Sequence, residues 1–162
     1  VGLVQWQMRS YKTLDDLFEQ VEFFVDAVSD YKSDFVLFPE YFNAPLMSKY
    51  NDKGESQAIR GLAQYTEEIR DRFINLAISY NINIITGSMP LIKEDGLLYN
   101  AGFLCRRDGT YEMYEKLHVT PDEIKQGINV LQLPYDRWSK RAYSLDMYKD
   151  NKRIDTLNIN LR

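Results

Sequence analysis

The sequence predicts an α/β domain in which a parallel sheet, built from strand–helix–strand units, is extended by an antiparallel hairpin. A short apolar run at positions 35–38 lies between polar turns and ends at Pro39, which is typical of a strand buried on both faces. Helical patterns precede and follow this run, and an Asp-Gly pair at positions 108–109 separates two later strand-like runs. Alternating strands and helices indicate a parallel sheet, and the Asp-Gly pair indicates the hairpin.

The first unit is predicted to be strand, helix and strand. Val1–Met8 carries apolar residues separated by small or amide residues, as a strand does. From Leu14 to Ser29, apolar residues recur every three or four positions, so one face of a helix would be apolar. Thr13 precedes acidic residues that suit the positive end of a helix dipole. Phe35–Phe38 then completes a βαβ unit with a right-handed crossover.

A second unit follows Pro39. Asn43–Ser56 contains turn signals and is longer than a simple connector, so we expect a loop that walls a pocket. An amphipathic helix is predicted for Glu67–Tyr80, and a buried strand for Ile82–Thr86, ending at a Gly-Ser pair.

The remaining chain is predicted to be mostly strands. Leu97–Arg106 and Thr110–Lys116 form the hairpin around the Asp-Gly turn. Thr120–Glu123 reads Thr-Pro-Asp-Glu, which indicates a helix start with a capping box and does not exclude a second role for its glutamate. Two short strands are expected at Leu131–Tyr135 and Thr156–Leu161.

Composition restricts the class of protein. The chain has 162 residues, a formal net charge of -4 and 44% hydrophobic residues, which is ordinary for one globular domain. Its basic residues are dispersed, so we expect no nucleic-acid partner. No stretch approaches the roughly 20 apolar residues of a membrane span, so we expect no membrane partner. A single cysteine permits no internal disulfide and favours a cytoplasmic location.

Glu40 and Lys116 are the first candidates for chemistry. Glu40 follows a buried strand, at the edge where parallel sheets bind ligands, and Lys116 ends the second hairpin strand. Taken singly, such a glutamate more often caps a loop or pairs with a basic residue, and such a lysine is more often solvated. If they share one sheet edge, the carboxylate can exchange protons while the ammonium stabilises an oxyanion.

Other catalytic constellations are disfavoured. His118 is the only histidine, and no Cys-x-x-Cys or His-Glu-x-x-His is present, so we expect neither a metal nor another cofactor. Cys105 lies within a predicted strand, a setting typical of a buried apolar residue rather than of a nucleophile. Gly-x-Ser-x-Gly, phosphate-loop and dinucleotide glycine patterns are also missing.

Six short segments form an ordered set over about residues 1–127. They are Val1–Met8, Phe38-Pro39-Glu40-Tyr41, Ile84–Met89 with its Thr-Gly-Ser end, Leu98-Tyr99-Asn100-Ala101, Asp108-Gly109 and Tyr114-Glu115-Lys116-Leu117-His118. Each is weak alone, but the order and spacing of the set are specific and resemble the nitrilase, or carbon-nitrogen hydrolase, superfamily. The Thr-Pro-Asp-Glu run that follows resembles the branch often fused to an N-terminal acetyltransferase domain.

The resemblance implies an αββα sandwich that hydrolyses amides, nitriles or carbamoyl groups of small molecules through a cysteine thioester, without a cofactor. It implies that Glu40 is the general base and that Lys116 supports the tetrahedral intermediate. Glu123 and Tyr41 are the corresponding candidates for substrate positioning. A small-molecule amide or nitrile is then the expected substrate, and a homo-oligomer, commonly a dimer formed through helices, is the expected assembly.

The chain departs from the family pattern in its last third. No Cys-Tyr-Asp or Cys-Trp-Asp nucleophile motif occurs in residues 116–162, and the tail cannot hold the second half of the sandwich. We therefore expect 1–127 to be the N-terminal half of the hydrolase domain, and 128–162 to be an unassigned tail from C-terminal pieces, discontinuous with it. Three explanations account for the missing nucleophile motif and second half. Either residues are left out between the segments of the sequence, or the chain is truncated or internally deleted, or it is a natural remnant that binds without catalysing.

Two other functions remain open from the sequence. The first is a catalytically inactive binding or assembly module on the same scaffold, which the missing nucleophile favours. The second is an unrelated acidic α/β domain in which Glu40 and Lys116 are surface residues that lie far apart. The distance between these two side chains separates the second alternative from the others.

Overall fold

The computed structural model describes residues 1–129, 143–149 and 152–159. The chain divides into two compact units, Val1–Val130 and Leu131–Arg162. The second unit contains a two-stranded antiparallel sheet of β6 (Tyr143–Lys149) and β7 (Lys152–Ile159), and β7 includes most of the strand expected at 156–161. The strand expected at 131–135 lies outside the described residues.

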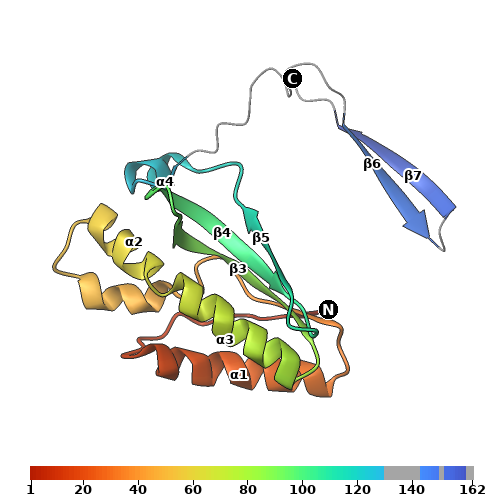
Figure 1. The fold of residues 1–162 in the computed structure, drawn as a ribbon, viewed down its shortest axis with the longest axis horizontal. Coiled ribbons are helices and arrows are strands. Elements are labelled where there is room, and N and C mark those ends of the chain that lie inside the picture. The colour runs from red at the N-terminus through yellow and green to blue at the C-terminus, as the bar shows by residue number, and fades with distance from the viewer. Residues whose placement is uncertain (130–142, 150–151, 160–162) are drawn as a thin grey trace. The chain divides into compact units, whose positions relative to one another are not determined.

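The first unit contains a five-stranded mixed sheet in the order β1-β2-β3-β4-β5. Figure 1 shows β3, β4 and β5 side by side. β1 (Gly2–Leu3), β2 (Phe35–Leu37) and β3 (Asn83–Ile92) are parallel. β4 (Leu98–Cys105) and β5 (Tyr111–Glu115) continue the sheet with antiparallel pairing. The structure therefore has the parallel sheet and the added hairpin that the sequence predicts.

Helices α1 (Leu14–Asp30) and α3 (Thr66–Ser79) lie side by side on one face of this sheet (Figure 1). The rings of Phe18 and Phe73 meet between them, with centroids 5.3 Å apart. α1 begins with a capping box in which Thr13 accepts a hydrogen bond from the Asp16 backbone N–H at 3.0 Å. Both helices confirm the expected apolar periodicity.

β1 is much shorter than the strand predicted for Val1–Met8. The Val4 N–H still donates to the Leu37 carbonyl at 2.9 Å, but the chain then leaves the sheet. Trp6 turns toward the aromatic core, where its ring centroid lies 5.8 Å from that of Phe42. Packing of the large indole against other aromatic rings outweighs further strand pairing at a sheet edge.

The loop predicted for Asn43–Ser56 is wrong over most of its length. A 3-10 helix, η1 (Ala44–Tyr50), occupies its centre, and helix α2 (Glu55–Ala63) begins before its end. The Tyr50 hydroxyl donates to the Gly61 carbonyl at 3.2 Å, and the ring fills the space where a side chain at Gly61 would stand. This tertiary contact explains a glycine in the helix, which weakened the sequence pattern.

β3 runs past the end predicted at Thr86. A bulge between Ile85 and Ser88 absorbs Gly87, whose φ is 70°. A Cβ atom on Gly87 would clash with the Pro39 carbonyl oxygen, so only glycine fits this approach. The Gly-Ser pair therefore lies at a bulge within the strand rather than at its end.

The two faces of the sheet differ in burial. One row of paired residues is fully buried beneath the helices and consists of Val36, Ile84 and Cys105. The adjacent row points to the other face, is apolar, and is partly or largely exposed: Leu3, Leu37, Ile85 and Leu104. Within residues 1–129, one layer of helices and one sheet thus form half of a sandwich with an apolar open face.

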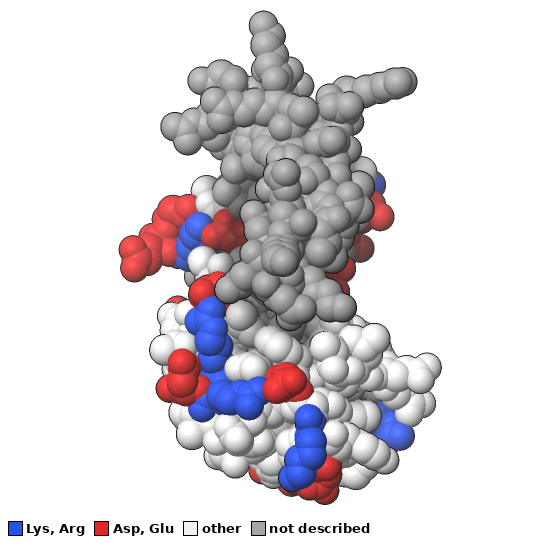
Figure 2. Space-filling model, turned by 90° about the vertical axis from the view of Figure 1, so that its right-hand side faces the viewer, with Lys and Arg blue, Asp and Glu red and all other residues white. Residues whose placement is uncertain are grey.

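Charged side chains are mixed on the surface that Figure 2 shows, where Lys and Arg lie beside Asp and Glu rather than in one continuous basic area. Elsewhere, helices α1 and α3 are joined by the ion pair between Arg72 and Asp15, at 2.6 Å. No helix in the described part of the chain is both long enough and apolar enough to cross a membrane.

Candidate active site

Four elements bring polar side chains together at the edge of the sheet where β2 ends. Glu40 follows β2, Asn100 lies in β4, and Lys116 follows β5. Glu123 comes from the short helix α4 (Pro121–Lys125). The turn that carries Glu40 is held to β3, because the Tyr41 N–H donates to the Ser88 carbonyl at 2.8 Å.

One oxygen of Glu40 receives all the hydrogen bonds that the described residues give to this carboxylate. Oε1 accepts from Asn100 Nδ2 at 2.7 Å, Lys116 Nζ at 2.9 Å and Ser88 Oγ at 3.2 Å. The side chain is 46% exposed. Oε2 is therefore the oxygen that remains available to exchange a proton.

Glu123 has a different environment, since both of its oxygens are occupied. Oε1 accepts from Asn100 Nδ2 at 2.7 Å and Lys116 Nζ at 3.2 Å, and Oε2 accepts from the Thr120 backbone N–H at 2.7 Å. Its burial acts to raise the pKa, but the hydrogen bonds from Thr120, Asn100 and Lys116 outweigh burial and lower the pKa below its usual value. Glu123 is thus held as an anion.

Lys116 lies between the two carboxylates. Its partial burial acts to lower the pKa, but hydrogen bonds to Glu40 and Glu123 outweigh burial and raise the pKa. The ammonium has three N–H groups, and two of them are directed to these carboxylates. One N–H is left for another acceptor.

The position of Glu123 follows from a local sequence signal. The capping box predicted from Thr-Pro-Asp-Glu is present: Thr120 Oγ1 accepts from the Glu123 N–H at 3.3 Å, while the Glu123 carboxylate accepts from the Thr120 N–H. The cap fixes the side chain at the start of α4, where it also faces Lys116. One glutamate therefore both caps a helix and belongs to the polar cluster.

Tyr41 lies next to the cluster in an unusual backbone conformation. Its φ is 55°, which a residue with a large side chain rarely adopts. Its hydroxyl is buried and has no hydrogen-bond partner among the described residues. Burial, followed by the charges of Glu123 and Glu40, raises the pKa of Tyr41 well above its ordinary value. Its role in substrate positioning stays a prediction.

Cys105 lies away from this cluster. It follows Asn100 by five positions in β4, which is about 16 Å along a strand, and it points to the helix-covered face. Burial is the main cause that raises the pKa of its thiol to about 12. Its sulfur lies 4.0 Å from the Arg70 carbonyl oxygen of α3. These features are those of a buried apolar residue, as expected.

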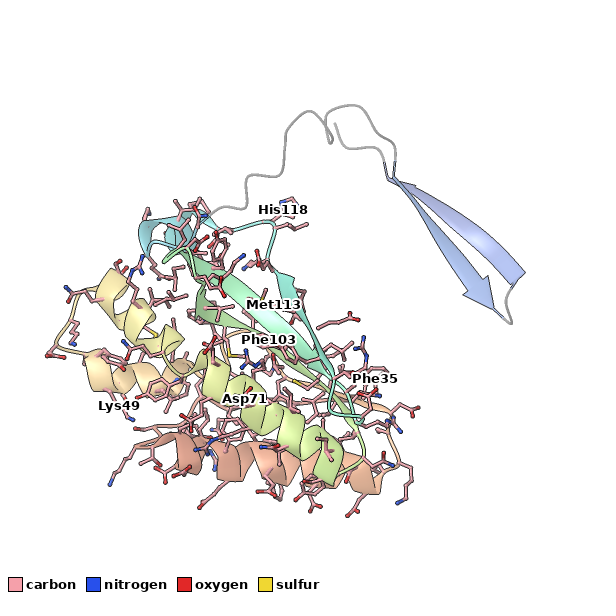
Figure 3. All side chains as sticks on the ribbon, viewed as in Figure 1. Phe35, Lys49, Asp71, Phe103, Met113 and His118 are labelled. Atoms are coloured by element: carbon pink, nitrogen blue, oxygen red, sulfur yellow. The ribbon has the colours of Figure 1, made fainter. Side chains whose placement is uncertain are left out.

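His118 follows Lys116 in the segment between β5 and α4 (Figure 3). In the described ranges, no group of three or more His, Cys, Asp or Glu residues is arranged to hold a metal ion.

Sequence reasoning did not assign Asn100 and Ser88 to the site, although both lie in the quoted motifs. Asn100 is 2% exposed, and polar side chains are rarely buried in a strand without partners. Its position among the apolar neighbours of β4 was the available signal. The hydrogen-bond partners themselves come from other strands and could not be read along the chain.

With this geometry in place, comparison with known proteins decides the family. Residues 1–140 match the sequence profile of the family described as carbon-nitrogen hydrolase. The chain belongs to the carbon-nitrogen hydrolase family. Glu40 Oε1 and Lys116 Nζ lie 2.9 Å apart in this chain, so the alternative in which they are distant surface residues of an unrelated domain is wrong.

The probable hydrolase YhcX of Bacillus subtilis (strain 168) is 42% identical to this chain over 125 residues, which are 77% of this chain and 24% of YhcX. A carbon-nitrogen hydrolase from Helicobacter pylori G27 has a similar structure, with a TM-score of 0.63 and 18% identity, over 82% of this chain and 44% of that one. An amidase from Nesterenkonia sp. gives a TM-score of 0.63 and 18% identity over 90% of this chain and 50% of that one.

These likenesses establish the fold. The chain spans about a quarter of the length of YhcX and half or less of the two solved structures. Together with the apolar open face of the sheet, this coverage fits a nitrilase-like αββα sandwich of which the chain holds a part.

Proposed function

We propose that this chain supplies the general base and the oxyanion support of an enzyme that hydrolyses a non-peptide carbon-nitrogen bond in a small amide, nitrile or carbamoyl compound. The observation that carries the proposal is the cluster of Glu40, Lys116 and Glu123 in a chain of the carbon-nitrogen hydrolase family. Its two carboxylates have environments that suit different roles.

In the proposed reaction, the nucleophile is a cysteine thiol. Cys105 is the single cysteine of the 162 residues and is far from Glu40, so the thiol belongs to a part of the protein outside this chain. Glu40 Oε2 takes the thiol proton as sulfur attacks the carbonyl carbon. The remaining N–H of Lys116 donates a hydrogen bond to the oxygen that becomes negative.

The second half of the reaction returns the proton. Glu40 gives it to the departing nitrogen, the carbon-nitrogen bond breaks, and a thioester and an amine or ammonia result. Water then attacks the thioester carbon while Glu40 takes one of its protons. The carbon-sulfur bond breaks, Glu40 returns the proton to sulfur, and the acid leaves with the thiol restored. Glu123 stays ionised throughout and keeps Lys116 protonated.

Small amides are the first substrates to test. One Nesterenkonia amidase structure is a variant lacking a glutamate and a cysteine in complex with acrylamide, and another shows acrylamide added at the active-site cysteine of that amidase. For this chain, they support a small amide and thiol chemistry. The proposal extends to a homo-oligomeric assembly, which light scattering of the full-length protein would test.

Glu40→Gln in the full-length protein tests the proposed reaction. The amide keeps the size of the side chain but cannot take a proton, so kcat/KM for ammonia release from a panel of small amides should fall roughly 10²- to 10⁴-fold. Glu115→Gln is the matched control, because Glu115 is a partly buried glutamate paired with Lys93 at 2.8 Å outside the cluster. Its activity should stay within about twofold of wild type.

The second candidate is a binding or assembly module without catalysis, which the lack of a second cysteine in the chain favours. It predicts no release of ammonia or amine and no activity sensitive to iodoacetamide. Hydrolysis that Glu40→Gln abolishes would exclude the module, whereas a full-length protein inert toward every amide and nitrile tested would refute the enzyme.

A further inference from the structure

Asn100 links the two carboxylates of the cluster. It is the third residue of β4 and is 2% exposed. Its Nδ2 is 2.7 Å from Glu40 Oε1 and 2.7 Å from Glu123 Oε1. A primary amide carries two N–H groups, so each carboxylate can receive one of them.

The chemistry of the partners fixes the orientation of this amide. Carboxylates accept hydrogen bonds, so the atom between Glu40 and Glu123 must be the nitrogen rather than the oxygen. The other end, Oδ1, is buried and has no partner among the described residues. Leaving an acceptor unpaired is unfavourable, which indicates that the two short hydrogen bonds from Nδ2 determine how the side chain sits.

The two carboxylates need such a link because one ammonium lies between two negative charges. Lys116 Nζ lies 2.9 Å from Glu40 and 3.2 Å from Glu123, and its single charge can neutralise only one of the two carboxylates. The two negative charges that share this ammonium repel each other. Hydrogen bonds to charged groups are about twice as strong as neutral ones, so a neutral amide with two donors reduces the repulsion without adding a charge. The ionisable groups around this amide are Glu40 after β2, Lys116 after β5 and Glu123 in α4. Tyr41 and Tyr114 of β5 lie nearby, and burial, together with the charge of Glu40, raises the pKa of each phenol.

We propose that Asn100 is a positioning residue that holds Glu40 by Oε1 and so presents Oε2 to the reacting groups. It acts through Glu40 and does not touch the substrate, because its polar atoms are buried and Nδ2 is occupied. The inference rests on the proposed function for its kinetic consequence. The clamp itself, one amide hydrogen-bonded to two carboxylates, is present in the folded protein and does not depend on the proposed function.

Kinetics of Asn100→Ala in the full-length protein test the positioning role. Misplacing a catalytic group by about 1 Å costs about 100-fold in rate, so kcat should fall about 100-fold while KM stays within about threefold. Asn83→Ala is the matched control: Asn83 is also a strand asparagine whose amide makes two hydrogen bonds, to the Asp34 carbonyl and from the Arg107 N–H, away from the cluster. Its kcat should be near that of wild type.

A second readout requires no activity. Asn100→Asp keeps the shape of the side chain but sets a third carboxylate against Glu40 and Glu123. Repulsion by Glu40 and Glu123 raises the pKa of the introduced carboxylate in the folded state. The resulting loss of folding stability is therefore full at about pH 7, where this carboxylate is ionised, and decreases as the pH falls below the raised pKa. The deficit in unfolding midpoint relative to wild type should therefore shrink between about pH 7 and pH 4, whereas that of Asn83→Asp should not.

The wild-type protein supplies a third readout if the variants do not fold. The two side-chain amide protons of Asn100 should exchange slowly with solvent and shift in NMR spectra as the cluster carboxylates are protonated. Fast exchange, an unchanged deficit for Asn100→Asp across pH, or a raised KM with kcat intact would each overturn the inference. Absence of hydrolysis in the wild type would refute the proposed function alone, because the pH and exchange measurements still test the clamp.

Discussion

Glu40 and Glu123 are the same residue type, but their different surroundings suit them to different roles. Glu40 is 46% exposed and keeps one oxygen free of hydrogen bonds within the described residues, whereas Glu123 is 9% exposed and has both oxygens occupied. Exposure and a free oxygen suit a group that exchanges protons, and full hydrogen bonding suits a permanent anion. The shared ammonium of Lys116 makes the two roles depend on each other.

Cys105 gives a prediction at this scale. Because its thiol is buried and its pKa is raised to about 12, Cys105→Ala should leave hydrolysis by the full-length protein within about twofold of wild type. The lost packing should lower the free energy of unfolding by about 1 kcal/mol, measured by urea titration. Loss of hydrolysis with an unchanged unfolding curve would instead make Cys105 a member of the site.

At the scale of elements, the approach of β3 to the turn after β2 positions Glu40. Gly87 lies against Pro39, and Ser88 both accepts from the Tyr41 N–H and donates to the Glu40 carboxylate. The bulge therefore has two effects on the site. It allows β3 to approach the turn at Pro39, and it directs the Ser88 side chain toward Glu40. An ordinary pleated strand would turn Ser88 to a different direction.

Gly87→Ala tests this contact, with Gly96→Ala as the control. Both glycines have positive φ, 70° and 73°, so both variants bear the backbone cost of about 1–2 kcal/mol. Only Gly87 also meets the Pro39 carbonyl, whereas Gly96 faces open space. Chemical denaturation should show Gly87→Ala to be less stable than Gly96→Ala by at least about 1 kcal/mol. Equal losses of stability in the two variants would mean that the contact between Gly87 and Pro39 does not constrain residue 87.

At the scale of the whole molecule, the sheet has one face covered by helices and one apolar face that is partly open. Ile84 is fully buried, and its neighbour Ile85 belongs to the open row. Nitrilase-like sandwiches place two sheets face to face, and this chain spans half or less of the structures it resembles. The open row is thus where a second sheet would pack.

Ile85→Lys and Ile84→Lys form a matched pair for this question. In the 162-residue chain, Ile85→Lys should cost less than about 1 kcal/mol, because a lysine stem can lie along a half-open surface. In the full-length protein the same change should cost several kcal/mol, since the ammonium would be buried beneath the second sheet. Ile84→Lys should be severe in both. Equal small costs for Ile85→Lys in the two proteins, from unfolding titrations, would contradict a covering sheet.

The sequence patterns predicted most of the helices and strands, because most of the signals for them are local. Alternating strands and helices, the acidic first turn of α1, the Asp-Gly turn and the box at Thr120 each act over a few residues, and each is present in the structure. The failures share one cause. β1 ends early, η1 and α2 replace a loop, and β3 continues through a bulge because Trp6, Tyr50 and Gly87 each contact residues of another segment of the fold.

The same division holds for the site. By itself, the sequence determined which residue types stand at the ends of β2 and β5 and at the start of α4, because turn and capping signals place Glu40, Lys116 and Glu123 there. Only the tertiary structure decided that one ammonium and one amide join the two carboxylates, which leaves Oε2 of Glu40 free. Those hydrogen bonds cross up to 76 positions, and no local preference encodes a contact of that span.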